Sequence, residues 1–185
     1  MKRKLGISLY PDHSDPQADR SYLETAQKYG FSRIFMSMLE VTDGKEAVAA
    51  KFKELIFFAK ELGYETILDV APAIFDELGI SYDDMRFFHE LGADGIRLDV
   101  GFDGNKEAML TYNPQQVAIE LNMSNDVAYL DNILTYQANR PYLYGCHNFY
   151  PQAGTALPYD FFASCSRRFK EQGIRTAAFV TSQVG

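Results

Sequence analysis

The sequence is short of features that mark several large classes of protein. Its 185 residues include only two cysteines, Cys146 and Cys165, which lack CxxC or zinc-ligand spacing and are too few for a disulfide scaffold. No pair of histidines has metal-ligand spacing, and lysines are absent from the ends of the expected strands. These absences disfavour a metal site and a Schiff-base or pyridoxal-phosphate enzyme, so we expect no cofactor.

Basic residues are also few and dispersed. Eighteen Lys and Arg stand against 25 Asp and Glu, the net charge is −7, and no basic cluster follows the first four positions. We therefore expect no nucleic-acid or membrane partner, and a small molecule is the better candidate. The first apolar run is short and soon meets Pro11 and Asp12, so we expect no signal peptide or membrane span and a cytoplasmic location. The oligomeric state stays open.

What the sequence does contain is a repeated pattern: an amphipathic segment, a glycine, and then an apolar run that stops near a polar side chain. It occurs as KYGFSRIFMSMLE, ELGYETILD, ELGADGIRLD and EQGIRTAAFVTS. Gly30, Gly63, Gly92 and Gly173 fit left-handed positions that end a helix and lead into a strand. The pattern predicts a repeating α/β unit.

Strands and helices are expected to alternate along the whole chain. The apolar runs predict seven strands, at residues 5–10, 33–38, 65–70, 95–100, 116–122, 142–147 and 175–180. Helix starts are expected at Asp15 with Pro16, at a capping box of Asp43 and Glu46, at Ser81 and at Pro158. In the first helix we expect a buried stripe that includes Tyr22 and Tyr29.

Parallel strands joined by helices can form an open doubly wound sheet or a closed barrel. The turn after the first strand reads YPDHSDP rather than a glycine-rich phosphate loop, which favours the barrel. A complete barrel of this kind needs about 250 residues. We therefore expect one α/β domain over residues 1–185: a (β/α)8 TIM-type barrel that is truncated after the seventh strand.

Catalytic groups of such barrels lie where the strands end, at the carboxyl-terminal face. The polar residues at these positions are Tyr10, Asp12, Glu40, Asp69, Arg97, Asp99, Asn122, His147, Asn148 and Tyr150. Glu40, Asp69 and Asp99 are the catalytic candidates, because two carboxyl groups can act as acid and as nucleophile or base in glycoside hydrolysis. The other seven are candidates for substrate binding, through hydrogen bonds and ring stacking.

Some of these residues also have a structural explanation. Asp12 follows a proline and could serve only the turn, and Glu40 could be a solvated loop residue. Asp69 and Asp99 lie in apolar strands, where a carboxylate is either paired or used in chemistry. Arg97 lies two residues before Asp99, so an ion pair between them is about as good an explanation as substrate binding.

Several long motifs resemble one known family. The segments LGISLYPDHSD, YLETAQKYGFSRIFMSMLE, ILDVAP, GIRLDVGF, ELNMSN and GCHNFYP are similar to the 6-phospho-N-acetylmuramidase (MupG-like) family, glycosidases once labelled outer surface proteins. The resemblance implies a barrel followed by a cyclophilin-like domain, which we expect to lie outside residues 1–185. It also implies cleavage of the bond between 6-phospho-N-acetylmuramic acid and N-acetylglucosamine in cell-wall recycling, with Glu40, Asp69 and Asp99 as the acids.

Two other functions stay open at this stage. A non-catalytic sugar-phosphate-binding barrel needs only hydrogen-bonding groups at the strand ends. A sugar-phosphate isomerase or epimerase would use a base and a counter-acid instead of an acid that protonates a leaving group.

Overall fold

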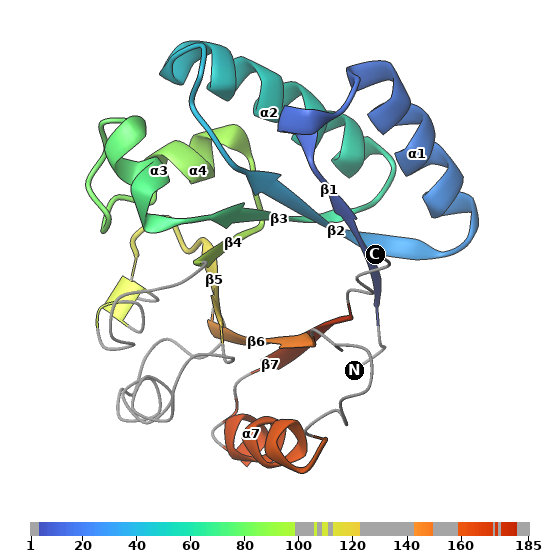
Figure 1. Cartoon of the computed structure of the whole chain (residues 1–185), viewed down its shortest axis with the longest axis vertical. Helices are drawn as coiled ribbons and strands as arrows, with labels where there is room; N and C mark the ends of the chain where they lie inside the picture. Colours follow the sequence, from blue (N-terminus) through green and yellow to red (C-terminus); the bar gives the residue numbers. More distant parts are fainter. Residues whose placement is uncertain are drawn as a thin grey trace, which may run out of the picture. The chain divides into compact units, whose positions relative to one another are not determined.

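A computed structural model of the chain describes residues 4–98, 106, 109–110, 113–122, 143–149, 159–171, 173 and 175–180. The chain divides into two compact units, residues 1–97 and 98–185, and each is described by itself. Figure 1 shows the elements of both units.

The first unit alternates strands and helices. Its strands are β1 (Leu5–Leu9), β2 (Phe31–Met38), β3 (Glu65–Val70) and β4 (Gly95–Leu98, which reaches the unit boundary). Its helices are the 3-10 turn η1 (Pro11–His13), α1 (Pro16–Lys28), α2 (Lys45–Glu61), α3 (Pro72–Glu77) and α4 (Arg86–Leu91). The strands lie in sequence order, and β2 pairs in parallel with both β1 and β3. The expected strand at residues 65–70 is confirmed residue for residue.

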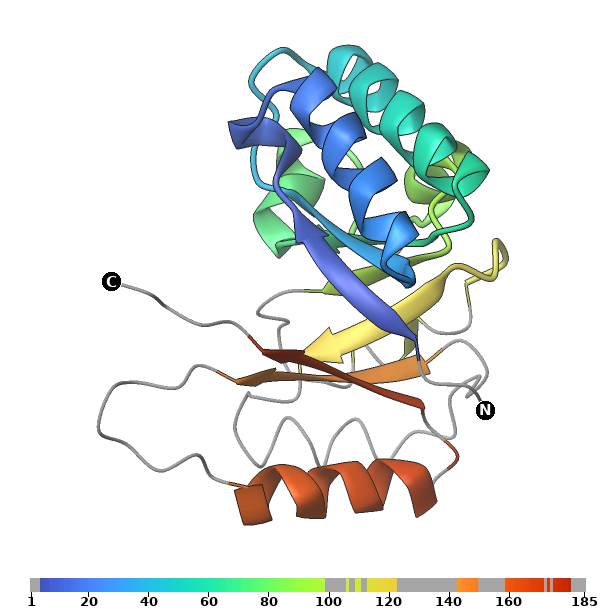
Figure 2. The same cartoon turned by 90° about the vertical axis from the view of Figure 1, so that its right-hand side faces the viewer.

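The helices cover one face of these four strands. Figure 2 shows α1 and α2 side by side above the strands, and Ile34, Met36 and Met38 of β2 are fully buried beneath the helices. Alternate residues of a strand point to opposite faces, so Phe35 and Ser37 belong to the other face. The helix-covered face is apolar, and the opposite face carries the polar groups described below.

The helix starts are only partly as expected. Asp15 caps α1 by accepting hydrogen bonds from the backbone N–H groups of Gln17 and Ala18, both at 3.0 Å, so that prediction is confirmed. The capping box of Asp43 and Glu46 is wrong, because α2 begins after Gly44, which has φ of +84° and no side chain to cap the helix.

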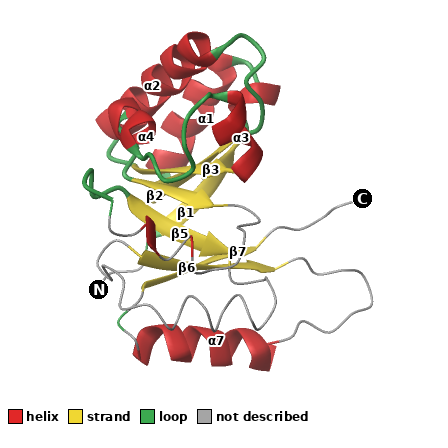
Figure 3. Ribbon diagram, turned by 90° about the vertical axis from the view of Figure 1, so that its left-hand side faces the viewer, coloured by secondary structure: helices red, strands yellow, loops and turns green. Residues whose placement is uncertain are grey.

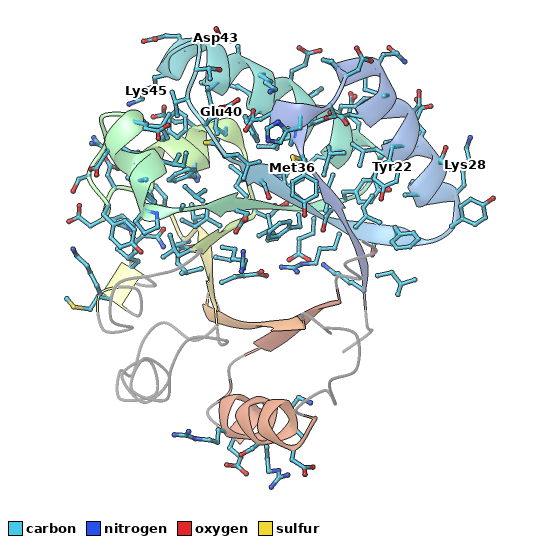
Figure 4. The ribbon with its side chains drawn as sticks, in the orientation of Figure 1. Tyr22, Lys28, Met36, Glu40, Asp43 and Lys45 are labelled. Carbon is cyan, nitrogen blue, oxygen red and sulfur yellow. The ribbon has the colours of Figure 1, made fainter. Side chains whose placement is uncertain are left out.

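Two further local predictions fail. The residue before α4 is Met85 rather than Ser81. Tyr22 and Tyr29 are exposed, because the buried stripe of α1 runs through Asp19, Leu23 and Ala26 and the helix ends before Tyr29. Tyr22 can be followed on α1 in Figure 4.

The predicted glycine turns are confirmed. Gly30, Gly63, Gly92 and Gly173 have φ values of +86°, +88°, +85° and +75°. A side chain at these left-handed positions would strain the backbone, so each glycine permits the sharp passage from a helix into the following strand.

The second unit repeats the same construction. Its strands are β5 (Ala118–Asn122), β6 (Leu143–Phe149) and β7 (Arg175–Val180), and β6 pairs in parallel with both neighbours. Helix α7 (Tyr159–Glu171) lies along one face of β6 and β7 (Figure 3). The expected strand at residues 175–180 is confirmed, and β6 continues two residues beyond the predicted end. Pro158, the expected start of a helix, lies outside the described residues.

Both units are therefore α/β structures with parallel strands, as expected from the sequence. In the part of the chain that the structure describes, no helix has the length and apolar character needed to cross a membrane.

Candidate functional site

Three side chains meet near the carboxyl ends of β2, β3 and β4. Arg97 donates a hydrogen bond from Nη1 to Oδ1 of Asp69 at 2.6 Å, and the Ser37 hydroxyl lies 3.3 Å from Oδ2 of Asp69. Ser37 and Asp69 are register partners in β2 and β3, which places them on the same face. We call Ser37, Asp69 and Arg97 the carboxyl-end cluster.

The carboxyl-end cluster is largely withdrawn from solvent. The side chains of Asp69 and Arg97 are 11% and 5% exposed, and the guanidinium of Arg97 lies 5.6 Å from the centre of the Phe35 ring. An ion pair in this setting fixes the direction of the carboxylate. The partner of Arg97 found here is thus Asp69 on the neighbouring strand, whereas Asp99, the partner considered from sequence, lies outside the described residues.

Glu40 lies just beyond β2 and differs from Asp69 in its surroundings. Figure 4 shows it in the segment that leads from β2 to α2, at the end of the unit where Asp43 and Lys45 also lie. Its side chain is exposed and forms no hydrogen bond or ion pair with another residue of the described part of the chain. Glu40 is three residues past Ser37, so β2 carries it to the same strand ends as the carboxyl-end cluster.

The segment after β1 contains two candidate side chains: Asp12, which is bound by other protein groups, and Tyr10, which is exposed. Both carboxylate oxygens of Asp12 bind protein groups: Oδ2 accepts from the backbone N–H of Leu39 at 2.9 Å, and Oδ1 pairs with Nζ of Lys51 at 2.8 Å. The Asp12 side chain is only 6% exposed. Tyr10, by contrast, is exposed and lies at the end of β1, where its ring remains available for stacking.

The other candidates belong to the second unit or lie outside the described residues. Asn122 ends β5 opposite Cys146. His147 and Asn148 lie inside β6, opposite Ala178 and Phe179, and not after its end as predicted. Asp99 and Tyr150 lie outside the described residues.

One acidic residue was missed by the sequence analysis. Glu120 is fully buried in β5, two residues before the strand ends at Asn122. A carboxylate inside the apolar run AIEL is the signal that singled out Asp69 in ILDV, and it could have been applied here as well.

Metal-ligand groups and surface hollows are the other features that could form a site. Among the described residues, no group of three or more His, Cys, Asp or Glu side chains could hold a metal ion. A surface hollow of about 540 Å³ lies at the amino ends of the strands, lined by Lys4, Lys60, Glu65 and Asp94 among others. Its lysines pair with its acids, Lys4 with Glu65 and Lys60 with Asp94, so the charges of the hollow are largely satisfied within it.

Parallel strands with helices between them, and polar side chains at the carboxyl ends of those strands, define an α/β protein of the kind that binds small molecules at its strand ends. Comparison with known proteins makes this specific. The family model "6-phospho-N-acetylmuramidase, N-terminal" matches residues 5–185, and the chain belongs to this family. The resemblance seen in the motifs is confirmed.

Two solved structures are similar to this chain. An uncharacterized protein of B. cereus is 58% identical with a TM-score of 0.80, and the match covers 100% of this chain and 49% of that one. A conserved protein of Enterococcus faecalis with an unknown function is 24% identical with a TM-score of 0.73, covering 94% and 47%, and this likeness shows the fold alone. The chain thus spans about half the length of these relatives. No curated protein matches it.

Proposed function

We propose that this chain is the catalytic part of a glycosidase that cleaves 6-phospho-N-acetylmuramic acid–N-acetylglucosamine disaccharide during cell-wall recycling in the cytoplasm. The observation that carries the proposal is the family match over residues 5–185, since the family is named for this muramidase. The parallel α/β units support a (β/α)8 barrel, whose strand ends would form the sugar site. The smaller cyclophilin-like domain implied by the resemblance would lie outside this chain.

The surroundings of the two described acids suggest different roles. Asp69 pairs with Arg97, which fixes its direction and suits a nucleophile or a group that stabilises positive charge on the sugar. Glu40 is exposed and has no ionic partner among the described residues, which suits a group that exchanges a proton with the leaving oxygen or with water. Asp99 remains the third candidate acid.

Substrate binding would draw on the remaining polar candidates. Tyr10 offers an exposed ring for stacking on a sugar, and Arg97 offers a guanidinium beside Asp69. Asn122, His147, Asn148 and Tyr150 are proposed to hydrogen-bond the sugar or its phosphate, with no metal or other cofactor in the reaction.

The decisive experiment incubates the full-length protein with the phosphorylated muramyl disaccharide and identifies the products. Release of N-acetylglucosamine and 6-phospho-N-acetylmuramic acid supports the proposal, and the unphosphorylated disaccharide serves as the matched control for phosphate recognition. Binding without turnover would favour a non-catalytic sugar-phosphate-binding protein. An isomerised or epimerised product with the glycosidic bond intact would favour the isomerase alternative.

A further inference from the structure

Two carboxylates bind the backbone on either side of Glu40. Asp12, from the turn η1 after β1, accepts the N–H of Leu39 at 2.9 Å. Glu77, from the last residue of α3 after β3, accepts the N–H of Val41 at 3.1 Å. The residue between these two anchored N–H groups is Glu40, whose side chain is exposed.

We infer that Asp12 and Glu77 are positioning residues that hold residues 39–41, and with them the Glu40 carboxylate, in the geometry that the reaction requires. The inference rests on the proposed function and deepens it. Residues 39–44 join β2 to α2 without belonging to either, so the sheet and helix hydrogen bonds do not fix them. Anchors from two different elements restrict the segment from both sides, and a displacement of about 1 Å at a reacting group can cost about 10²-fold in rate.

The contacts of Asp12 favour positioning over substrate binding. Its side chain is 6% exposed and both of its oxygens are engaged, so it has little capacity left for a ligand. Lys51, its ionic partner, comes from α2 and is 40% exposed. Asp12 thus ties the end of β2 to the helix that follows.

The positioning role requires a side-chain oxygen that accepts the backbone N–H, and it does not require a negative charge. In full-length protein, Asp12→Asn and Glu77→Gln each keep an oxygen that can accept the backbone N–H, so we expect kcat within about 3-fold of wild type. Asp12→Ala and Glu77→Ala remove the acceptor, so we expect kcat to fall about 10-fold or more with KM nearly unchanged. Lys51→Met removes the ion pair and leaves the hydrogen bond from Leu39 to Asp12, so its kcat should be similar to that of Asp12→Asn.

The matched control for Glu77 is its neighbour Asp76. Asp76 is also exposed at the end of α3, and among the described residues its side chain makes no hydrogen bond or ion pair with residues 39–41, so Asp76→Ala should retain wild-type kcat. If Asp12→Asn loses as much activity as Asp12→Ala, Asp12 acts through its charge and the positioning role is wrong for it. The same comparison of Glu77→Gln with Glu77→Ala decides the role of Glu77.

Whether Asp12 affects kcat by positioning Glu40 is tested in a Glu40→Gln background. If Asp12 acts by placing Glu40, Asp12→Ala should cause no further loss of kcat once the Glu40 carboxylate is gone, because effects of residues that act as a unit are not additive. A second, full 10-fold loss in that background would overturn the inference.

A readout independent of activity separates this inference from the proposed function. Amide hydrogen exchange at Leu39 and Val41 should accelerate about 10-fold or more in Asp12→Ala and Glu77→Ala respectively, and stay unchanged in Asp76→Ala. If the wild-type protein cleaves no disaccharide, the proposed function fails while faster exchange still shows that the two anchors hold the segment. Unchanged exchange in both alanine variants would overturn the anchoring itself, whatever the activity.

Discussion

The first unit carries two clusters of charged side chains on the same face of its strands, at opposite ends. The amino-end cluster contains Glu65, which pairs with Lys4 at 2.7 Å and approaches Arg33 at 3.6 Å. The carboxyl-end cluster contains Asp69, which pairs with Arg97 at 2.6 Å. Register pairing places Arg33 opposite Glu65 and Ser37 opposite Asp69. The two clusters are therefore four residues apart along both β2 and β3.

Both clusters pair a carboxylate with a basic side chain, but they differ in exposure to solvent. In the amino-end cluster Lys4 is 53% exposed, whereas the Asp69 and Arg97 side chains are both nearly buried. An exposed pair contributes little, and a buried pair is costly to disrupt because the remaining charge has lost its water. Similar residues on one sheet face are therefore expected to differ in role by strand end, with function at the carboxyl ends and stability at the amino ends.

The largest difference is expected in catalysis. In the full-length protein, Glu40→Gln and Asp69→Asn should each lower kcat for the phosphorylated disaccharide by about 10²- to 10⁴-fold, because the amides keep the shape but cannot supply a proton or a negative charge. Glu65→Gln, the same kind of change in the amino-end cluster, should leave kcat within about 2-fold of wild type.

Steady-state kinetics and circular dichroism on the three variants check this expectation. A large loss of kcat in a folded Glu65→Gln protein would break the comparison between the strand ends. Near-native rates in both Glu40→Gln and Asp69→Asn would remove these two acids from the reaction and leave Asp99 as the candidate to test.

The second expected difference is in stability. Arg97→Met takes the guanidinium away from a carboxylate that is 11% exposed, so the free energy of unfolding should fall by about 3–5 kcal/mol. Lys4→Met disrupts a pair whose lysine is more than half exposed, so the loss should stay below about 1 kcal/mol. Urea unfolding of the two variants beside wild type measures both.

A double variant sharpens the same measurement. Asp69→Leu combined with Arg97→Met replaces the buried pair by apolar side chains, and such replacements are often close to neutral. The double variant should therefore be more stable than Arg97→Met alone. Equal losses for Arg97→Met and Lys4→Met would show that burial does not distinguish the clusters.

The parts of the fold that the sequence predicted are those set by local chemistry. The strand at 65–70 is a short apolar run bounded by a glycine and a proline, and Asp15 with Pro16 forms a helix start from adjacent residues. The glycine turns depend on a backbone conformation that few other residues adopt. The capping box at Asp43 fails because a competing glycine, Gly44, starts the helix.

The site was less predictable because its contacts join residues far apart in the chain. The sequence placed Asp69 and Arg97 at neighbouring strand ends, but only the packing shows that they pair with each other across 28 positions. The bond from Leu39 to Asp12 spans 27 positions, and no spacing rule connects a loop carboxylate with the N–H of a distant strand end. Glu120 was overlooked although its sequence context carried the same signal as that of Asp69.

The smallest expected effect concerns an ion pair that is more exposed than either cluster. Arg86, with a side chain that is 70% exposed, pairs with Asp84 at 2.5 Å just before α4. The side-chain hydrogen bond from Arg86, aided by the Arg86 backbone N–H, lowers the pKa of Asp84 from 3.8 to about 2. Because the folded state favours the ionised carboxylate, Asp84 stabilises the protein above about pH 4, and this contribution is lost as the pH falls towards 2.

Asp84→Asn removes that charge and leaves an oxygen that can still accept the Arg86 N–H. Its melting temperature should lie about 2 °C or less below that of wild type near neutral pH, since exposed pairs contribute little. The difference should shrink as the pH falls from about 4 towards about 2, because Asp84 takes up its proton at a higher pH in the unfolded state than in the folded state. Thermal melts of both proteins across this range measure it. A difference that stays constant with pH, or one as large as that of Arg97→Met, would contradict the ranking of ion pairs by exposure that separates the two strand ends.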